Sequence, residues 1–221
     1  MQFFELEISR IKRALNTGLL PGLQSQLKMM PVTRTIEKAY LHDMRGSTTK
    51  TNNPKKSAVL LLLYPKNGVA HIIMMVRAID KSVHSGQISF PGGKFENSDS
   101  SLVYTALREA KEEIGIVPND VEIIGELSSI YIPPSNFDVY PFVGVSKSTP
   151  VFSPNNEVNK LLEIKLSDLQ NPTIKGYEKI KHRLGNDFIV PCYHINQEVV
   201  WGASAMILSE FLDLNLQQAN S

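Results

Sequence analysis

A glycine-rich loop that leads into an amphipathic helix, residues 86–115, restricts the fold of this chain more than any other segment. The loop contains Phe90-Pro91-Gly92-Gly93, and a strand is expected to end at these residues. Two glycines let a backbone approach a ligand closely, and a loop before a helix N-terminus suits anionic phosphate. The helix is expected over residues 100–114, where apolar residues form one stripe: Val103, Ala106, Leu107, Ala110 and Ile114. Gly115 follows, where a left-handed residue commonly ends a helix.

Three glutamates lie on one side of this expected helix. Glu109, Glu112 and Glu113 occupy positions i, i+3 and i+4, which are neighbours on a helix surface. Such like charges repel one another, and a hard divalent cation such as Mg²⁺ or Mn²⁺ would neutralise them. Arg108 is expected to hold a glutamate or a backbone carbonyl in place beside the metal ligands. An isolated acidic cluster is more often a solvated helix face, but the glycine-rich loop favours a metal and phosphate site.

The rest of the chain alternates strand-like and helical segments, which predicts an α/β (α+β) fold with a mixed sheet flanked by helices. Strands are expected at residues 58–64, 71–77, 121–130, 140–146, 158–165, 188–194 and 198–201, and further helices at residues 3–15, 23–30 and 203–214. Residues 1–45 are expected to be an N-terminal helical extension and residues 58–215 the compact domain. Residues 46–57 contain no apolar side chain and are expected to be a linker or mobile loop.

Composition excludes several classes of function. The chain has 23 basic and 22 acidic residues, a net charge of +1, so it has no overall field to attract nucleic acid. The apolar run at residues 58–64 is too short to span a bilayer, so no membrane partner is expected. The single cysteine, Cys192, cannot form an internal disulfide and fits a reducing, cytoplasmic compartment, where it is expected to be a packing residue.

Residues 93–115 resemble the Nudix box of the Nudix hydrolases. The matching positions are Gly93, Asp99, Arg108, Glu109, Glu112, Glu113 and Gly115. Asp99 stands where glutamate is usual, and eight residues rather than seven separate it from Arg108. The resemblance implies an α/β/α sandwich and metal-dependent hydrolysis of a nucleoside diphosphate linked to another moiety. It also implies the ligands of the Mg²⁺ or Mn²⁺ ion, which are Glu109, Glu112, Glu113 and the Gly93 carbonyl.

A longer part of the chain is similar to the coenzyme A pyrophosphatases, a branch of the same family. The similarity lies in Arg77-Ala78, in Gly86-Gln87-Ile88-Ser89-Phe90-Pro91-Gly92-Gly93, and in the segments at 20–31 and 201–206. It implies that coenzyme A or a derivative is cleaved to 3′,5′-ADP and a phosphopantetheine product. The candidate substrate-binding residues are Arg77, His84, Gly86, Gln87, Phe90 and Gly92. Ser82 stands where a second arginine is usual, which predicts weaker discrimination against dephospho-coenzyme A.

Several questions stay open at the level of sequence. The general base is either Glu109 or Glu157. Glu157 is a candidate because it opens an expected strand after a loop that could close over the site. The substrate is either coenzyme A or another ADP-linked diphosphate, such as NADH or ADP-ribose. The rival function is a non-catalytic nucleotide-binding module, for which loss of a box carboxylate would be the sign, and none is lost. A small molecule is the expected partner, and a homodimer is left open.

Overall fold

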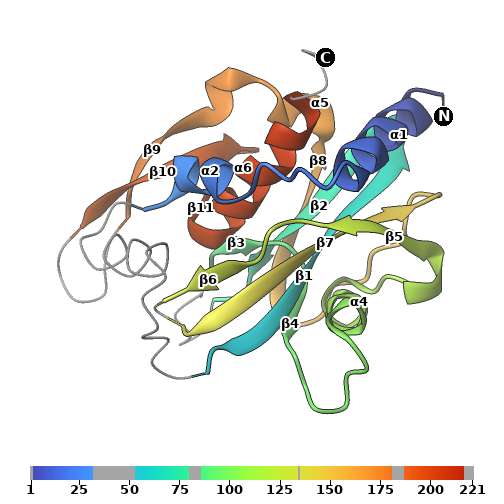
Figure 1. The fold of residues 1–221 in the computed structure, drawn as a ribbon, viewed down its shortest axis with the longest axis horizontal. Coiled ribbons are helices and arrows are strands. Elements are labelled where there is room, and N and C mark those ends of the chain that lie inside the picture. Colours follow the sequence, from blue (N-terminus) through green and yellow to red (C-terminus); the bar gives the residue numbers. More distant parts are fainter. Residues whose placement is uncertain (1, 32–52, 80–85, 134, 181–186, 217–221) are drawn as a thin grey trace.

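The computed structural model describes residues 2–31, 53–79, 86–133, 135–180 and 187–216, and Figure 1 shows the path of the chain. The α-helices are α1 (Gln2–Asn16), α2 (Gly22–Gln26), α4 (Leu102–Ile114), α5 (Leu166–Leu169) and α6 (Gly202–Leu216). The strands are β1 (Lys55–Lys66), β2 (Val69–Arg77), β3 (Ile88–Ser89), β4 (Gly92–Lys94), β5 (Val121–Glu126), β6 (Ile130–Ile132), β7 (Phe137–Ser146), β8 (Val158–Lys165), β9 (Lys175–Ile180), β10 (Phe188–Ile195) and β11 (Glu198–Trp201). Short 3₁₀ helices lie at Leu27–Met29, Pro118–Asp120 and Pro172–Ile174.

A mixed sheet forms the centre of the fold. Its strand order is β3-β2-β1-β7-β5, with β4 paired to β1, β6 to β7 and β8 to β2. The β1–β7 pair is parallel, with Leu60 opposite Phe142, whereas the other pairs described in this sheet are antiparallel. Parallel strands need a crossover connection, and the part of the chain between β1 and β7 that contains α4 supplies it. A second, antiparallel sheet has the order β11-β10-β9.

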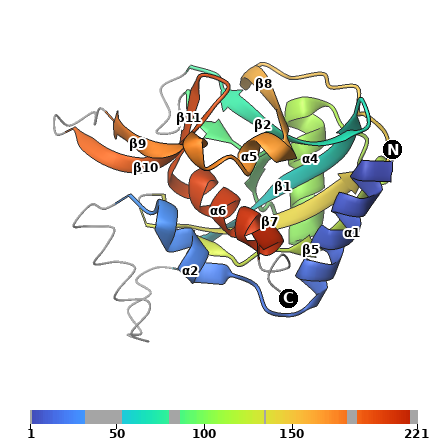
Figure 2. The same ribbon diagram turned by 90° about the horizontal axis from the view of Figure 1, so that it is seen from above.

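Apolar side chains on both faces of the central sheet explain its two helical layers (Figures 1 and 2). Neighbouring residues of a strand point to opposite faces. Leu60 and Leu62 of β1 therefore pack with Ala110 of α4, whereas Leu61 and Leu63 pack in the larger apolar cluster that includes α1 and α6. The expected fold class, a mixed sheet between helical layers, is confirmed.

The N-terminal helices pack on the same core as the sheet. Phe4, Ile8 and Ile11 lie on one side of α1, are at most 4% exposed and belong to the larger apolar cluster. Their spacing is that of the stripe expected over residues 3–15, so α1 confirms the helix predicted there.

The helix α2 is joined to α6 by a buried carboxylate. The side chain of Glu210 is 0% exposed and accepts hydrogen bonds from the backbone N–H of Gly22 at 3.2 Å and from Gln26 Nε2 at 2.8 Å. It also accepts the Ser128 N–H at 3.0 Å. A buried carboxylate needs several donors, and here they come from two distant segments, which fixes α2 against α6.

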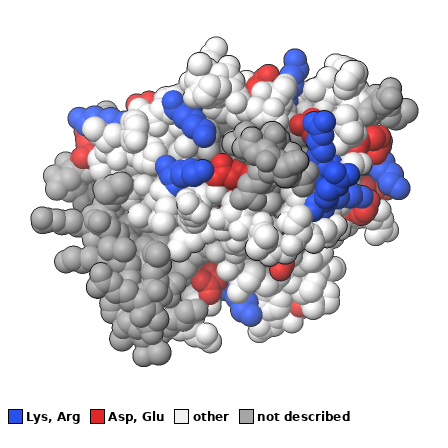
Figure 3. Space-filling model, turned by 45° about the horizontal axis from the view of Figure 1, so that its top comes forward, with Lys and Arg blue, Asp and Glu red and all other residues white. Residues whose placement is uncertain are grey.

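Charged side chains of both signs are intermixed on the face of the molecule that Figure 3 shows. The face in Figure 3 shows basic and acidic groups close to one another rather than one large patch of either sign. Within the described ranges, no helix is long and apolar enough to cross a lipid bilayer. Cys192 is completely buried, in agreement with a packing role.

The first hairpin differs from its expected limits. β1 begins at Lys55, three residues before the expected start, and continues to Lys66. The chain then reverses at Asn67 and Gly68, which have φ values of 52° and 75°. Two successive residues with positive φ suit the twist of a two-residue hairpin turn. Of the expected linker, residues 46–52 lie outside the described residues.

Two further elements differ from the sequence predictions. The strand expected over residues 121–130 is divided into β5 and β6, because the chain leaves the ladder where the Ser128 N–H donates to Glu210. β9 is absent from the expected strands. Its six residues include three charged ones and a glycine, and they alternate only between exposed and half-buried positions, so they carry little apolar pattern.

Candidate active site

The loop between β3 and α4 is fixed closely against β1. β4 pairs with β1 so that Gly93 lies opposite Ala58. A Cβ atom at Gly92 would overlap the backbone of Ala58 and Val59, so only glycine fits at this position. In this conformation the Gly92 N–H donates to Glu113 Oε2 of α4 at 2.8 Å. The close approach that two glycines permit is thus used to bind a carboxylate of the helix.

The helix α4 begins and ends at residues suited to those positions. Ser101 is the N-cap, and its hydroxyl accepts the Tyr104 N–H at 3.1 Å, so the helix starts two residues after the expected position. Gly115 has a φ of 77° and ends the helix, as expected. These limits place the three glutamates in the C-terminal half of α4.

Glu113 is the most buried of the candidate carboxylates, with 3% of its side chain exposed. It accepts the Gly92 N–H and lies 3.2 Å from Arg77 Nη1. Burial raises the pKa of Glu113 to about 7, although the Gly92 and Arg77 contacts lower it. The nearby carboxylates of Glu109 and Glu157 also contribute to this rise.

Glu109 and Glu112 lie closer to the surface. The Glu109 carboxylate touches Gly93, where an added Cβ would overlap it, and 18% of its side chain is exposed. Burial raises the pKa of Glu109, and Arg108 opposes that rise. Glu112 is half exposed. The structure thus places Glu109 directly beside the residue whose carbonyl is the fourth expected ligand.

Arg108 connects the start of the box to these two glutamates. Its Nε lies 2.9 Å from Asp99 Oδ1, and its Nη2 donates to the Lys94 carbonyl at 3.2 Å. Nη1 then lies 3.0 Å from Glu109 and 3.3 Å from Glu112. Hydrogen bonds from Arg108 are the main reason that the pKa of Asp99 is lowered to about 2, and in turn they raise the pKa of Arg108. Arg108 contacts both kinds of partner expected for it, glutamates and a backbone carbonyl.

Arg77 lies between two carboxylates from different parts of the chain. It is the last residue of β2, and its Nη2 lies 3.7 Å from Glu157 Oε2 while its Nη1 contacts Glu113. Glu157 is the more open of the two, with 66% of its side chain exposed. The structure therefore brings Arg77, Glu113 and Glu157 together, although they are far apart in sequence.

A model of the NUDIX domain matches residues 54–184, which include all of these residues. The chain belongs to the Nudix family. A protein of Salmonella dublin named "uncharacterized Nudix hydrolase NudL" is 36% identical over 167 residues, which cover 74% of this chain and 84% of that protein. The protein of the same name from Salmonella paratyphi B is 35% identical over the same shares. A solved MutT/nudix family protein from Enterococcus faecalis aligns with 86% of this chain and 70% of its own, with a TM-score of 0.48 and 14% identity.

The expectation of an enzyme is confirmed: this is a Nudix hydrolase, a family that cleaves nucleoside diphosphates linked to another group.

The other candidate substrate-binding residues lie in varied surroundings. Gly86 is exposed, with a φ of 69°, and the Gln87 carbonyl accepts the Arg77 N–H at 3.0 Å. Phe90 is 2% exposed and packs in the larger apolar cluster. His84, like Ser82, lies outside the described residues.

Two residues that the sequence patterns do not single out hold candidate site residues in place. The Thr105 hydroxyl donates to Asp99 Oδ2 at 2.8 Å. Asn155 Oδ1 accepts the Glu157 N–H at 2.9 Å. An asparagine whose side chain accepts the N–H of the residue two positions later forms a common type of turn, so the sequence could have indicated Asn155. A threonine within a helix gives no such indication.

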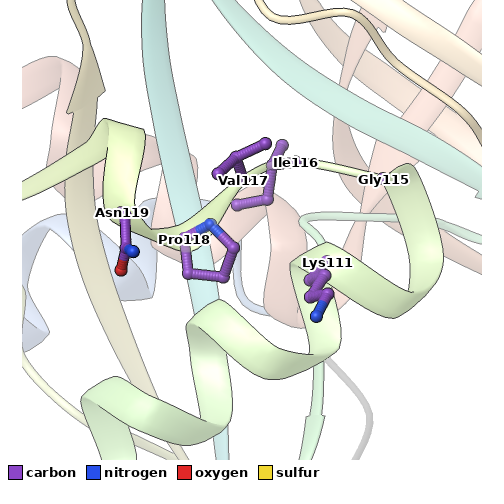
Figure 4. Close-up of a pocket in the computed structure, with 6 residues that line it drawn as sticks. All are labelled: Lys111, Gly115, Ile116, Val117, Pro118 and Asn119. Atoms are coloured by element: carbon purple, nitrogen blue, oxygen red, sulfur yellow. The ribbon is translucent and has the colours of Figure 1, made fainter.

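A surface hollow of about 500 Å³ lies on another side of α4 (Figure 4). Its lining residues are Lys111, Gly115, Ile116, Val117, Pro118 and Asn119. The Lys111 side chain lines this hollow. The hollow shares no residue with the metal ligands that the sequence predicts.

The candidate ligands supply oxygen donors, but their carboxylates are not gathered around one point. Within the described part of the chain, no three His, Cys, Asp or Glu side chains are grouped closely enough to hold a metal. Instead, Arg108 contacts Glu109 and Glu112, and Arg77 contacts Glu113. The oxygen donors nevertheless suit Mg²⁺ or Mn²⁺, which prefer carboxylate and carbonyl ligands.

Proposed function

We propose that this Nudix hydrolase cleaves the diphosphate bridge of coenzyme A or one of its derivatives, with Mg²⁺ or Mn²⁺, to give 3′,5′-ADP and a phosphopantetheine product. The observation that carries the proposal is the convergence of Arg77 with Glu113 and Glu157 beside the glycine-rich loop. Arg77 and this loop belong to the part of the sequence that is similar to coenzyme A pyrophosphatases. Arginine suits a diphosphate because its planar fork of donors matches phosphate oxygens.

The residues that would hold the ion are Glu109, Glu112, Glu113 and the Gly93 carbonyl. A bound divalent ion supplies positive charge for the diphosphate and lowers the pKa of a water molecule. Arg108 acts through the glutamates: its contacts with Asp99 and Lys94 keep Glu109 and Glu112 oriented. A carboxylate-rich site without such arginines would repel an anionic substrate.

We assign the general base to Glu157 rather than Glu109. Glu157 is exposed to solvent water, whereas Glu109 is held between Gly93 and Arg108. In this assignment the oxygen of a water attacks one phosphorus while Glu157 accepts the proton. The bond from that phosphorus to the bridging oxygen breaks, and the other phosphate leaves with the bridging oxygen.

Another ADP-linked diphosphate, such as NADH or ADP-ribose, is the second candidate substrate. The observation that favours it is Ser82, which stands where the coenzyme A branch usually has an arginine. With one arginine fewer to bind the 3′-phosphate of coenzyme A, the protein would discriminate less against substrates that lack this phosphate.

A panel of coenzyme A, dephospho-coenzyme A, NADH and ADP-ribose tests the proposal, with either ion and products identified by mass. We expect 3′,5′-ADP from coenzyme A. Glu113→Gln is expected to lower kcat/KM at least about 100-fold by removing a ligand charge, whereas Glu126→Gln, at an exposed position of β5, serves as the matched control. Cleavage of no panel member, or a fully active Glu113→Gln enzyme, would reject the proposal.

A further inference from the structure

Asn155 lies at the junction between the end of α4 and the loop that carries Glu157. Its backbone N–H donates to the Glu113 carbonyl at 3.0 Å, and its side-chain Oδ1 accepts the Glu157 N–H at 2.9 Å. Its own carbonyl accepts the Val158 N–H at 3.2 Å. One residue therefore links the backbone of a candidate metal ligand to the backbone of the candidate base.

The same loop is held to α4 at a second point. The Ser153 N–H donates to the Ile114 carbonyl at 3.0 Å. The last carbonyls of a helix have no partner within the helix, so they are available for such bonds. Gly115 lets the loop approach, because a Cβ there would lie 2.8 Å from Ser153 Cβ. The end of α4 thus serves as the support on which this loop rests.

The far end of the loop is held by β2. The Glu157 carbonyl accepts the Ala78 N–H at 2.8 Å, directly after Arg77. The Glu157 side chain is 66% exposed, and its contact with Arg77 at 3.7 Å is longer than a normal hydrogen bond. The direction of this carboxylate therefore depends mainly on its backbone, which Asn155 and Ala78 fix from both sides.

We propose that Asn155 is a positioning residue for the hydrolytic reaction, which keeps the Glu157 carboxylate in register with the glutamates of α4. This inference rests on the proposed function, in which Glu157 is the base. Removing Oδ1 leaves the Glu157 N–H without its partner and loosens the backbone from which the carboxylate projects. The metal ligands and Arg77 stay in place, so the step that needs the base should suffer while substrate binding does not.

The test compares Asn155→Ala, Asn155→Asp and the neighbouring control Asn156→Ala in the full chain, with the best substrate of the panel. Asn156 is exposed beside Asn155, so its variant controls for changing this loop. We expect Asn155→Ala to lower kcat about 10-fold, which is about 1.4 kcal/mol, and to change KM less than twofold. Asn155→Asp keeps the acceptor oxygen and should retain most of kcat.

A double-mutant cycle with Glu157→Gln separates positioning from general loosening of the fold. If Asn155 acts through Glu157, Asn155→Ala should cost no further kcat once Glu157 is replaced. A 10-fold loss that persists in the Glu157→Gln background, or an Asn155→Ala enzyme within twofold of wild type, would overturn the inference. It would leave the proposed function standing. If the wild-type chain cleaves no panel member, the proposed function fails, and the inference fails with it.

Discussion

Replacing Asp99 by asparagine should destabilise the protein in a way that depends on pH. The Asp99 side chain is 0% exposed and lies 2.9 Å from Arg108 Nε. It also accepts the Glu96 N–H at 3.0 Å and the Thr105 hydroxyl at 2.8 Å. An asparagine at this position has no negative charge to attract Arg108. Its amide N–H groups would also face N–H and O–H groups that now donate to the carboxylate. The Nudix box would therefore lose the contact that fixes its arginine.

The magnitude follows from the pKa of Asp99, which is lowered from 3.8 to about 2, chiefly by hydrogen bonds from Arg108. At about 1.4 kcal/mol per pKa unit, the ionised carboxylate contributes about 2 kcal/mol to the free energy of unfolding. A group with a lowered folded-state pKa stabilises the protein above its unfolded-state pKa. That contribution is therefore complete above about pH 4 and disappears as the pH falls through 2.

Urea unfolding of wild type and Asp99→Asn between pH 7 and pH 3 measures this contribution. We expect a difference of about 2 kcal/mol at pH 7 and pH 5, and a smaller one at pH 3. Asp120→Asn, at an exposed aspartate, should cost less than about 0.5 kcal/mol at each pH. The reasoning is wrong if Asp99→Asn matches this control at pH 7, or if its cost does not change with pH.

Three further substitutions test other parts of the structure. Gly93→Ala should lower kcat/KM at least about 10-fold with little change in Tm, because its methyl group displaces a flexible carboxylate of α4 rather than backbone; unchanged activity would contradict this. Gln26→Ala removes a donor to the buried Glu210 carboxylate and should cost about 1–3 kcal/mol by urea unfolding, unlike the exposed Gln24→Ala. Ser82→Arg should raise the preference for coenzyme A over dephospho-coenzyme A roughly 10- to 100-fold in kcat/KM, and an unchanged ratio would show that this position does not bind the 3′-phosphate.

The glycine-rich loop and α4 could be predicted because their signals are local. The apolar stripe of the helix recurs about once per helical turn. The left-handed conformation that ends the helix, with a φ of 77°, concerns Gly115 alone. The grouping of Glu109, Glu112 and Glu113 on one side of α4 also follows from helix geometry alone. These features do not depend on where the helix lies in the molecule.

The partners of the site residues depend on the register of the sheet, which sequence spacing does not contain. Arg77 meets Glu113 because β2 ends beside the loop that binds the same carboxylate. The burial of Phe90 likewise follows from its place in the core beneath the sheet, although its position in the loop made it a candidate for substrate binding. β9 shows the same limit, since pairing with β10 rather than apolar pattern makes it a strand.

Glu113 is the residue at which these separate parts of the fold meet. Its carboxylate accepts the Gly92 N–H from the loop before α4 and contacts Arg77 at the end of β2. Its backbone carbonyl accepts the Asn155 N–H from the loop after α4. A displacement of the C-terminal turn of α4 would therefore move the glycine-rich loop, Arg77 and the loop that carries Glu157 together.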